Sequence, residues 1–324
     1  MTLRVVRSAE DWLREAAGEP AIAAIGNFDG LHRGHQQILA RVTERAHSTG
    51  RRSVVTTFDP HPTRVLRAES APPLIVTIEQ RLALFEAAGV DAALVLPFTP
   101  EFARLSPQDF AARILVETLH ASDVFVGENF RFGHRQQGDA ATLAELGARL
   151  GFAVDIVPSV RLRGHVVSST LVRQAVAAGR VEFAARMLGR PFSLSGKIRP
   201  GEGQGRKLVV PTLNLAWEQE LVPGRGVYAT EAAIADGRYQ AATNVGIRPT
   251  FDGARLTIES HLLDFSSELT EGLLEVRFCK RLRPEKKFAS PAELREQVLR
   301  DIDRARTFFA RLSRARLRSR PRSG

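Results

Sequence analysis

The first 187 residues alternate short apolar segments with amphipathic ones. The apolar segments are typical of buried strands, and the segments between them repeat their apolar residues at helical period. The expected strands are 21–26, 53–58, 91–98, 123–127 and 152–158, and the expected helices are 35–47, 79–89, 107–120 and 140–151. This alternation predicts an α/β domain with a parallel sheet and helices on both of its faces.

From residue 192 the pattern changes to strands without helices between them. The expected strands are 192–198, 212–217, 226–234, 238–247, 255–264 and 273–278, and Asp236-Gly237 is a hairpin signal between two of them. Such a run predicts a small closed β-barrel. A long helix should follow from Pro291, with Ser290 as its N-cap and apolar residues up to Leu312 along one face.

These patterns divide the chain into an α/β domain (1–187), a barrel domain with its helix (188–312) and a basic tail (313–324). The net charge of +10 is concentrated, because residues 311–324 hold six arginines and no acids, which leaves +4 for the rest. We interpret the tail as a disordered, solvated terminus and expect no specific nucleic-acid partner. The remaining positive charge suits phosphorylated small substrates.

Composition excludes several classes of protein. No stretch approaches the roughly 20 apolar residues of a membrane span, so no membrane partner is expected. The single cysteine, Cys279, excludes an internal disulfide framework and a cysteine-rich metal site. The first residues carry acids early and lack the core of a signal peptide, which favours a cytoplasmic protein.

The most informative stretch is Gly26–Gln36 (GNFDGLHRGHQ), which joins the first expected strand to the next helix. His32 and His35 lie three residues apart at the helix start, where unpaired backbone N–H groups attract anions. Gly34 lets the backbone approach a ligand closely. Two imidazoles there can donate to phosphate oxygens together, and nucleotidyl transfer needs such donors but no protein nucleophile. The alternative is a capping histidine beside a surface histidine.

The motifs resemble those of the bacterial bifunctional riboflavin kinase/FAD synthetases. In the first domain the resemblance rests on GNFDGLHRGH (26–35), TFDPHP (57–62), DVFVGENFRFG (123–133) and SSTLVR (168–173). It continues with GRKLVVPTLNL (205–215), GVYA (226–229), NVGIRPTF (244–251) and ESHLLDF (259–265). The resemblance implies an amino-terminal HxGH nucleotidylyltransferase that adenylates FMN with ATP. It also implies a carboxy-terminal module that phosphorylates riboflavin.

The expected adenylyltransferase site has His32 and His35 as its catalytic residues. The residues expected to bind ATP and its phosphates are Gly26, Asn27, Phe28, Asp29, Gly34, His61, Asn129, Ser168, Ser169, Thr170 and Arg173. The three hydroxyl residues precede a helical run and would form an anion site with Arg173 one turn further, unless they are an ordinary N-cap beside a surface arginine. Asn129 is assigned by resemblance, and His61, between two prolines, is interpreted as a third polar wall. Val166 stands where the family usually has a basic residue, which puts one phosphate contact into question.

The expected kinase site lacks a Walker-type phosphate loop. Its ATP- and flavin-binding residues are expected to be Gly201, Gly203, Gly205, Arg206, Pro211, Thr212 and Asn214. Thr212 and Asn214 are two apart on a strand, so they share a face where their oxygens can hold Mg²⁺ and a phosphate. The resemblance implies that Glu259 is the base for the ribityl hydroxyl, the alternative being a strand carboxylate in a salt bridge. Val209 and Leu213 replace the family's glycine and alanine, which predicts weakened ATP binding in an active kinase.

The chain is therefore expected to use Mg²⁺ as a cofactor, with riboflavin, FMN and ATP as small-molecule partners and FMN and FAD as products. Two alternatives stay open: a nucleotidylyltransferase of other specificity with an accessory barrel, and a non-catalytic flavin- or RNA-binding protein. The binding protein predicts no turnover and, for RNA, an affinity that falls steeply with salt. The oligomeric state is left open, with a weak homo-oligomer among the options.

Overall fold

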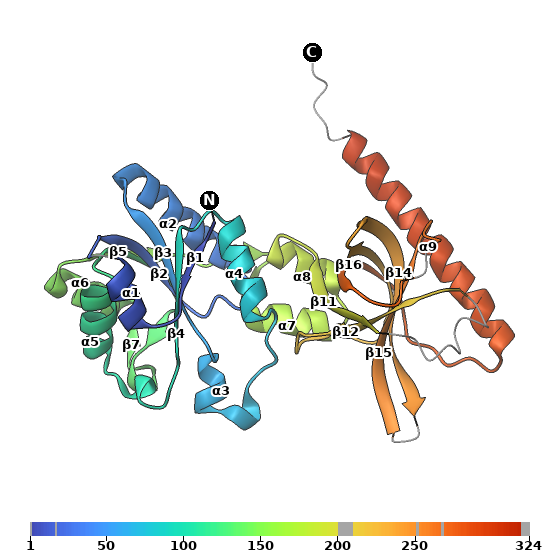
Figure 1. Ribbon diagram of the computed structural model, residues 1–324, viewed down its shortest axis with the longest axis horizontal. Helices are drawn as coiled ribbons and strands as arrows, with labels where there is room; N and C mark the ends of the chain where they lie inside the picture. Colours follow the sequence, from blue (N-terminus) through green and yellow to red (C-terminus); the bar gives the residue numbers. More distant parts are fainter. Residues whose placement is uncertain (1, 17, 200–209, 251–252, 267–268, 319–324) are drawn as a thin grey trace, which may run out of the picture. The chain divides into compact units, whose positions relative to one another are not determined.

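The computed structural model describes residues 2–16, 18–199, 210–250, 253–266 and 269–318 (Figure 1). Its contacts divide the chain into two compact units, Met1–Ser169 and Thr170–Gly324. The first unit contains a parallel sheet and the second a closed antiparallel barrel, so the predicted α/β-then-β order is confirmed.

The sheet of the first unit contains every strand predicted for that part of the chain and one more. Its strand order is β1-β4-β3-β2-β5-β8, and all neighbours pair in parallel. The bounds are β1 Arg4–Val6, β2 Ala21–Ile25, β3 Arg52–Phe58, β4 Ala92–Leu96, β5 Ala121–Gly127 and β8 Ala153–Val157. Sequence analysis missed β1 because this edge strand has only 3 residues and begins with a charged one.

Helices cover both faces of the sheet, as predicted. Alternate residues of β2 belong to two separate apolar clusters, because successive side chains of a strand point to opposite faces. One cluster includes Leu39 of α2 (Arg33–Thr49) and Phe85 of α4 (Ile78–Ala87). The other is built on α1 (Ala9–Ala16), α5 (Pro107–Phe110), the π-helical segment η3 (Ala111–Thr118) and α6 (Ala140–Leu150).

Short elements fill the connections of the first unit. They are α3 (Pro62–Leu66), the 3₁₀ turns η1 (Ala68–Ser70), η2 (Phe102–Arg104) and η4 (His134–Gln136), and two small antiparallel pairs. One pair joins β6 (Arg131–Phe132) to β7 (Gly138–Asp139), and the other joins β9 (Arg161–Leu162) to β10 (His165–Val166).

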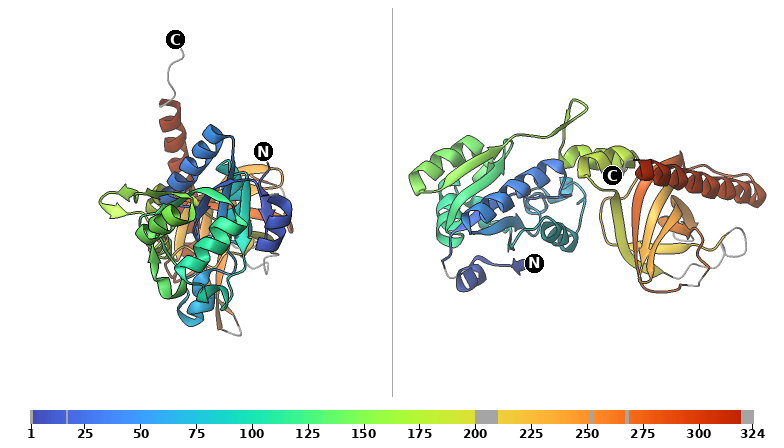
Figure 2. Two further views of the ribbon diagram at one scale, coloured as in Figure 1. Left: turned by 90° about the vertical axis from the view of Figure 1, so that its left-hand side faces the viewer. Right: turned by 90° about the horizontal axis from the view of Figure 1, so that it is seen from above.

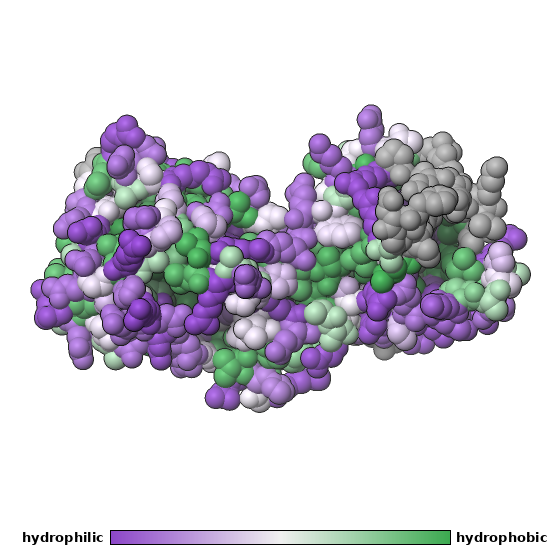
Figure 3. Space-filling view, turned by 90° about the horizontal axis from the view of Figure 1, so that it is seen from below, coloured by the Kyte–Doolittle hydropathy of each residue, from purple (hydrophilic) through white to green (hydrophobic). Residues whose placement is uncertain are grey.

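The surface seen in Figure 3 is mostly hydrophilic, with apolar patches between the polar residues.

The second unit is a closed barrel with the strand order β11-β12-β15-β14-β13-β16. The bounds are β11 Phe192–Arg199, β12 Leu213–Trp217, β13 Gly226–Ile234, β14 Gly237–Thr250, β15 Gly253–Leu262 and β16 Leu273–Pro284. Ile234 pairs with Gly237 across a tight turn, which confirms the predicted hairpin. Inside the barrel, the hydroxyl oxygens of Thr230 and Thr243 lie 2.7 Å apart and those of Thr243 and Ser260 lie 2.8 Å apart, so these buried polar groups are satisfied.

In the described part of the barrel unit there are three helices. The last, α9 (Pro291–Arg318), packs along the outer face of β13 and β14 through residues such as Ile302 and Phe309 (Figure 2). The backbone N–H of Glu293 donates to Ser290 Oγ at 3.2 Å, as predicted for an N-cap. The helix continues through residues 313–318, which sequence analysis assigned to the tail, because alanine, leucine and arginine are good helix formers.

The other two helices, α7 (Ser169–Ala177) and α8 (Val181–Leu188), precede the barrel strands. The apolar face of α8 is buried, and the helix contacts β11 and β16. The compact unit that contains the barrel therefore begins at Thr170, before residue 188, where the sequence patterns place the domain boundary.

Candidate functional sites

Three loops that sequence analysis singled out start at the same edge of the sheet. β2, β3 and β5 are parallel neighbours, and the loops with His32, His61 and Asn129 follow their carboxyl ends. Ligands of open α/β sheets bind at this edge. Asn129 is exposed there, and its Nδ2 donates to Ser159 Oγ at 3.1 Å.

The turn between β2 and α2 is tight and held by a buried carboxylate. Phe28, Gly30 and Leu31 have φ angles of 48°, 81° and 39°, and a Cβ on Gly30 would lie 2.9 Å from a methyl carbon of Ile75. Asp29 is 1% exposed, and its carboxylate accepts the backbone N–H groups of Ile75 and Val76. Left-handed backbone at non-glycine residues is uncommon and clusters at ligand sites. The Asp29 carboxylate therefore orders the turn, rather than facing outward.

The two histidines of this turn stack on each other. His32 is the N-cap of α2, and its Nδ1 accepts the backbone N–H of His35 at 3.3 Å. The ring centroids are 3.6 Å apart with planes 18° from parallel. Because Nδ1 of His32 is an acceptor, the proton of its neutral ring is on Nε2. His32 is buried and His35 is half-buried, and the structure brings them together as predicted.

The electrostatic surroundings keep His35 neutral. Burial, the His32 ring and the Arg81 guanidinium, in that order, hold the pKa of His35 well below its ordinary value of 6.5. Near pH 7 the ring therefore carries a single proton and can donate one hydrogen bond without being a cation. Its Nδ1 is buried without a hydrogen-bond partner among the described residues.

The remaining predicted residues occupy different positions around this turn. His61 is the N-cap of α3, where its Nδ1 accepts the backbone N–H of Thr63 at 3.3 Å. The Ser169 hydroxyl donates to the Asp29 carbonyl at 2.8 Å, so Ser169, the last residue of the first unit, is held at the turn. Phe28 is 1% exposed and packs edge-on against Phe85, so its ring belongs to the core.

Other predicted residues lie along the same segments. Gly26 directly follows β2, and its N–H donates to the Thr56 carbonyl at 3.1 Å, while Asn27 is exposed in the turn. Ser168 precedes α7, and Thr170 and Arg173 lie on that helix. Val166, the departure from the family pattern, lies in β10.

Sequence analysis missed a buried arginine at this edge. Arg81 of α4 is 2% exposed, and its Nη1 donates to Thr57 Oγ1 at 3.2 Å and to the Phe58 carbonyl at 3.4 Å. One signal was present, since Arg81 and Phe85 are four residues apart on the buried side of α4. A charged residue on an apolar helix face is unusual unless it has a partner inside.

Two of the predicted kinase residues, Asn214 and Glu259, lie on the outer face of the barrel. Asn214 of β12 is directly opposite Glu259 of β15, which in turn is opposite Asn244 of β14. All three are half-buried, whereas Leu213 and Ser260 beside them are buried. The register therefore aligns a carboxylate between two amides on neighbouring strands, and Asn244 is a member of this row that sequence analysis did not name.

A hydrogen bond holds the entry to β12 beside this row. His261 Nδ1 and the Pro211 carbonyl oxygen are 2.9 Å apart, so the ring N–H donates to the segment that precedes Thr212. Leu213, which replaces the family's alanine, is buried at 8% exposure and fills the barrel side of the strand. The predicted residues Gly201, Gly203, Gly205 and Arg206, and the departure Val209, lie outside the described residues.

The oxygens of the kinase row are of the type that Mg²⁺ binds. Thr212 just before β12, Asn214 on β12 and Glu259 on the adjoining β15 offer a hydroxyl, an amide and a carboxylate oxygen. Mg²⁺ in phosphate-transfer sites takes few protein ligands besides water and phosphate. Across residues 2–318, with the gaps given above, no three or more His, Cys, Asp or Glu side chains gather into a metal-binding group. The donor set therefore fits an ion held jointly with a substrate phosphate.

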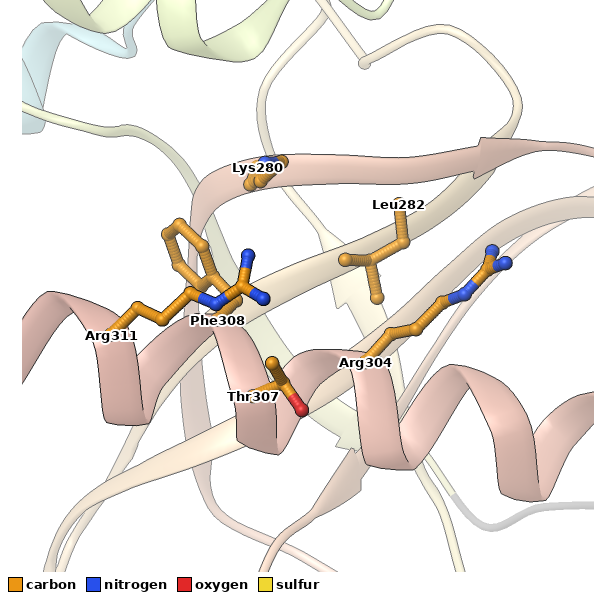
Figure 4. A pocket seen from close by; sticks show the side chains of 6 residues that line it. All are labelled: Lys280, Leu282, Arg304, Thr307, Phe308 and Arg311. Carbon is orange, nitrogen blue, oxygen red and sulfur yellow. The ribbon is translucent and has the colours of Figure 1, made fainter.

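A cavity of about 320 Å³ opens elsewhere on the barrel unit (Figure 4). It lies between β16 and α9 and is lined by Lys280, Leu282, Arg304, Thr307, Phe308 and Arg311. Of the predicted kinase residues that the structure describes, none lines it.

Comparisons with known proteins cover both units. Residues 14–171 match a family model described as FAD synthetase, and residues 188–309 match one described as riboflavin kinase. A Pseudomonas fluorescens protein named bifunctional riboflavin kinase/FMN adenylyltransferase is 38% identical, covering 95% of this chain and 98% of its own length. A protein of the same name from Escherichia coli K12 is 34% identical with the same coverage.

The chain is also similar in fold to a solved structure. The crystal structure described as a macrolide-efflux protein from Streptococcus pneumoniae has a TM-score of 0.84 at 28% identity, covering 94% of this chain and 99% of that one. Within the described part of this chain, no helix is both long and apolar enough to cross a membrane.

Proposed function

Because the chain belongs to the bifunctional riboflavin kinase/FMN adenylyltransferase family, we propose which of its residues carry each of the two reactions. The enzyme phosphorylates riboflavin to FMN with ATP and then joins FMN to the AMP part of a second ATP, which gives FAD and pyrophosphate. We assign adenylylation to residues 1–187 and riboflavin phosphorylation to residues 188–312, with 313–324 as a basic extension. The enzyme would work in the cytoplasm, where ATP is supplied.

For adenylylation, the stacked histidine pair would bind the phosphates of ATP. In this step a phosphate oxygen of FMN attacks the α-phosphorus of ATP, and the bond to the pyrophosphate oxygen breaks. Charge develops on the oxygens around phosphorus, and donors fixed in advance stabilise it. His32 and His35 would each donate one ring N–H, with the backbone at Gly34 allowing close approach. His61, Asn129, Ser168 and Ser169 would line the same edge. By the family resemblance, Thr170 and Arg173 are further candidates for phosphate binding.

For riboflavin phosphorylation, Glu259 would act as the general base. Its carboxylate would accept the proton of the ribityl hydroxyl while that oxygen attacks the γ-phosphorus of ATP and ADP leaves. Asn214 and Asn244 on either side would hold the carboxylate and the substrate in position. Thr212 and Asn214 would hold Mg²⁺, which neutralises phosphate charge when it is bound.

The observation that carries the adenylylation assignment is the His32–His35 stack at the helix start, capped by His32 itself. Radioactive phosphate separates the two reactions in one experiment. With riboflavin and ATP labelled at the γ-phosphate, the label should appear in FMN and then in FAD. With ATP labelled at the α-phosphate, it should appear in FAD alone. In the His35→Ala enzyme, α-label in FAD should be lost while γ-label in FMN persists; equal loss of both labels would refute the assignment.

A further inference from the structure

The Arg81 guanidinium is connected by hydrogen bonds to both loops that carry the histidines. Arg81 donates through Nη1 to the Thr57 hydroxyl and to the Phe58 carbonyl, at 3.2 and 3.4 Å. The Thr57 hydroxyl donates in turn to the Asn27 carbonyl at 3.3 Å. Thr57 and Phe58 end β3, and Asn27 begins the turn after β2. Arg81 therefore links the two loops that carry the histidines to α4.

This arrangement is costly for a merely structural contact. Nε of Arg81 is buried without a hydrogen-bond partner in the described structure, where the side chain also forms no ion pair. The carboxylates of Asp29 and Asp59 act on the guanidinium only from a longer distance. A buried charge without a directly paired opposite charge is unfavourable, and an apolar side chain of similar volume would fill the same space at less cost. The charge itself is therefore expected to have a use.

The use of the Arg81 charge follows from the protonation state of His35. His35 is neutral, so it can donate to a phosphate but supplies no positive charge. An arginine stays charged even where burial lowers its pKa. The charge of Arg81 acts on the His35 ring, so a triphosphate bound there would also be attracted by it.

We propose that Arg81 is a positioning residue for adenylyl transfer: its buried guanidinium, through Thr57 and the Phe58 carbonyl, fixes the two loops around the triphosphate and supplies positive charge behind the His32–His35 pair. This inference rests on the proposed role of His32 and His35. It predicts effects on FAD formation that riboflavin phosphorylation in the same chain does not share.

The test compares variants of the full-length enzyme. Arg81→Met removes the charge and keeps the bulk, Arg81→Lys keeps the charge and loses the forked geometry, and Thr57→Val breaks only the relay. Arg52→Met is a matched control at the opposite end of β3, where the arginine pairs with Glu19. FAD formation from supplied FMN is measured with kcat and KM for ATP, and riboflavin phosphorylation serves as the internal control for folding.

We expect Arg81→Met to lower kcat/KM for ATP in FAD formation by roughly 10- to 10²-fold, the scale of a misplaced reacting group. Thr57→Val should lower it less, and Arg52→Met should leave it unchanged. Riboflavin phosphorylation should persist in all of them. Full FAD activity in both Arg81→Met and Thr57→Val would overturn the proposal.

A pH profile shows whether Arg81 acts through its charge or only fills space in the core. The groups that act on His35 are His32 on α2 and Arg81 on α4, while Asp29 and Asp59 act on Arg81. Removing the cation raises the pKa of His35, so the acid limb of kcat/KM should move to higher pH in Arg81→Met and stay in place in Arg81→Lys. A slow Arg81→Met enzyme with an unmoved limb would show a structural role only.

Two further outcomes are decisive. If Arg81→Met loses both activities through misfolding, the test rests on Arg81→Lys and Thr57→Val. The proposal then stands only if both of these variants lose FAD formation while they keep riboflavin phosphorylation. If His35→Ala keeps full FAD activity, the proposed histidine site fails, and the Arg81 proposal, which rests on it, is overturned with it. That outcome differs from full activity in the Arg81 variants alone.

Discussion

Adding one methyl group at Gly34 separates the chemistry of the histidine pair from the stability of the helix that carries it. Gly34 lies inside the first turn of α2. A Cβ built there would be 3.2 Å from His32 Cε1 and 3.3 Å from His32 Nδ1, whereas ordinary contacts are 3.4–4 Å. The His32 ring must therefore shift by a few tenths of an ångström, away from the geometry that stacks it on His35.

The two expected effects of Gly34→Ala have opposite signs. Alanine is favoured over glycine in a helix by up to about 1 kcal/mol, so the free energy of unfolding should stay the same or rise. A misplacement of 1 Å can cost about 10²-fold in rate, so a shift of a few tenths of an ångström should lower kcat/KM for FAD formation by about tenfold. The methyl group also blocks the approach of phosphate to the backbone, so KM for ATP should rise.

The assay is FAD formation from FMN and ATP, with riboflavin phosphorylation measured in the same preparation. Unfolding in denaturant gives the stability, and Glu44→Ala, at an exposed position of the same helix, is the control variant. A Gly34→Ala enzyme with an unchanged KM for ATP and full FAD activity would refute the idea that the pair binds phosphate in this geometry. If the variant lost stability and also lost both activities, the claim that this change separates chemistry from helix stability would be refuted.

Three further perturbations test other parts of the account. Asp29→Asn should lower the free energy of unfolding of the first unit by roughly 1–3 kcal/mol, because a buried acceptor of backbone N–H groups is weakened, and denaturant unfolding would measure it; an unchanged midpoint would contradict this. A fragment from Thr170 should fold and make FMN but no FAD, and a fragment from Arg190 should be less stable, because it lacks the helices that pack on the barrel; equal melting temperatures would show that these helices add nothing. Chelation of Mg²⁺ should stop FMN formation and its return should restore it, whereas activity in excess chelator would exclude the proposed ion.

The spacing of apolar residues and the turn sequences were enough to predict the sheet, the barrel and the edge of the sheet where the candidate adenylyltransferase site lies. Strands rich in valine and alanine alternate with amphipathic helices, and parallel strands bring their carboxyl ends to one edge. The spacing of His32 and His35 predicted their position at a helix start, because a cap and the third helical residue are neighbours in space.

Features that depend on tertiary partners could not be predicted in the same way. The helical period of α8 shows an apolar face but not that the face packs on the barrel strands. The period of α4 likewise includes Arg81, but its burial depends on Thr57 and Phe58, which lie more than twenty residues earlier in the chain. The neutral state of His35 follows from burial and two neighbouring groups that only the fold brings together.

The central claim is that two separate sets of residues carry the two reactions, and one chromatographic measurement tests it most directly. Wild-type, His35→Ala and Glu259→Gln enzymes are each incubated with riboflavin, ATP and Mg²⁺, and the flavins are separated. The account predicts FAD from the wild type, FMN that accumulates with His35→Ala, and unchanged riboflavin with Glu259→Gln. The Glu259→Gln enzyme should still convert added FMN to FAD. Abundant FAD from riboflavin in either variant would contradict the claim.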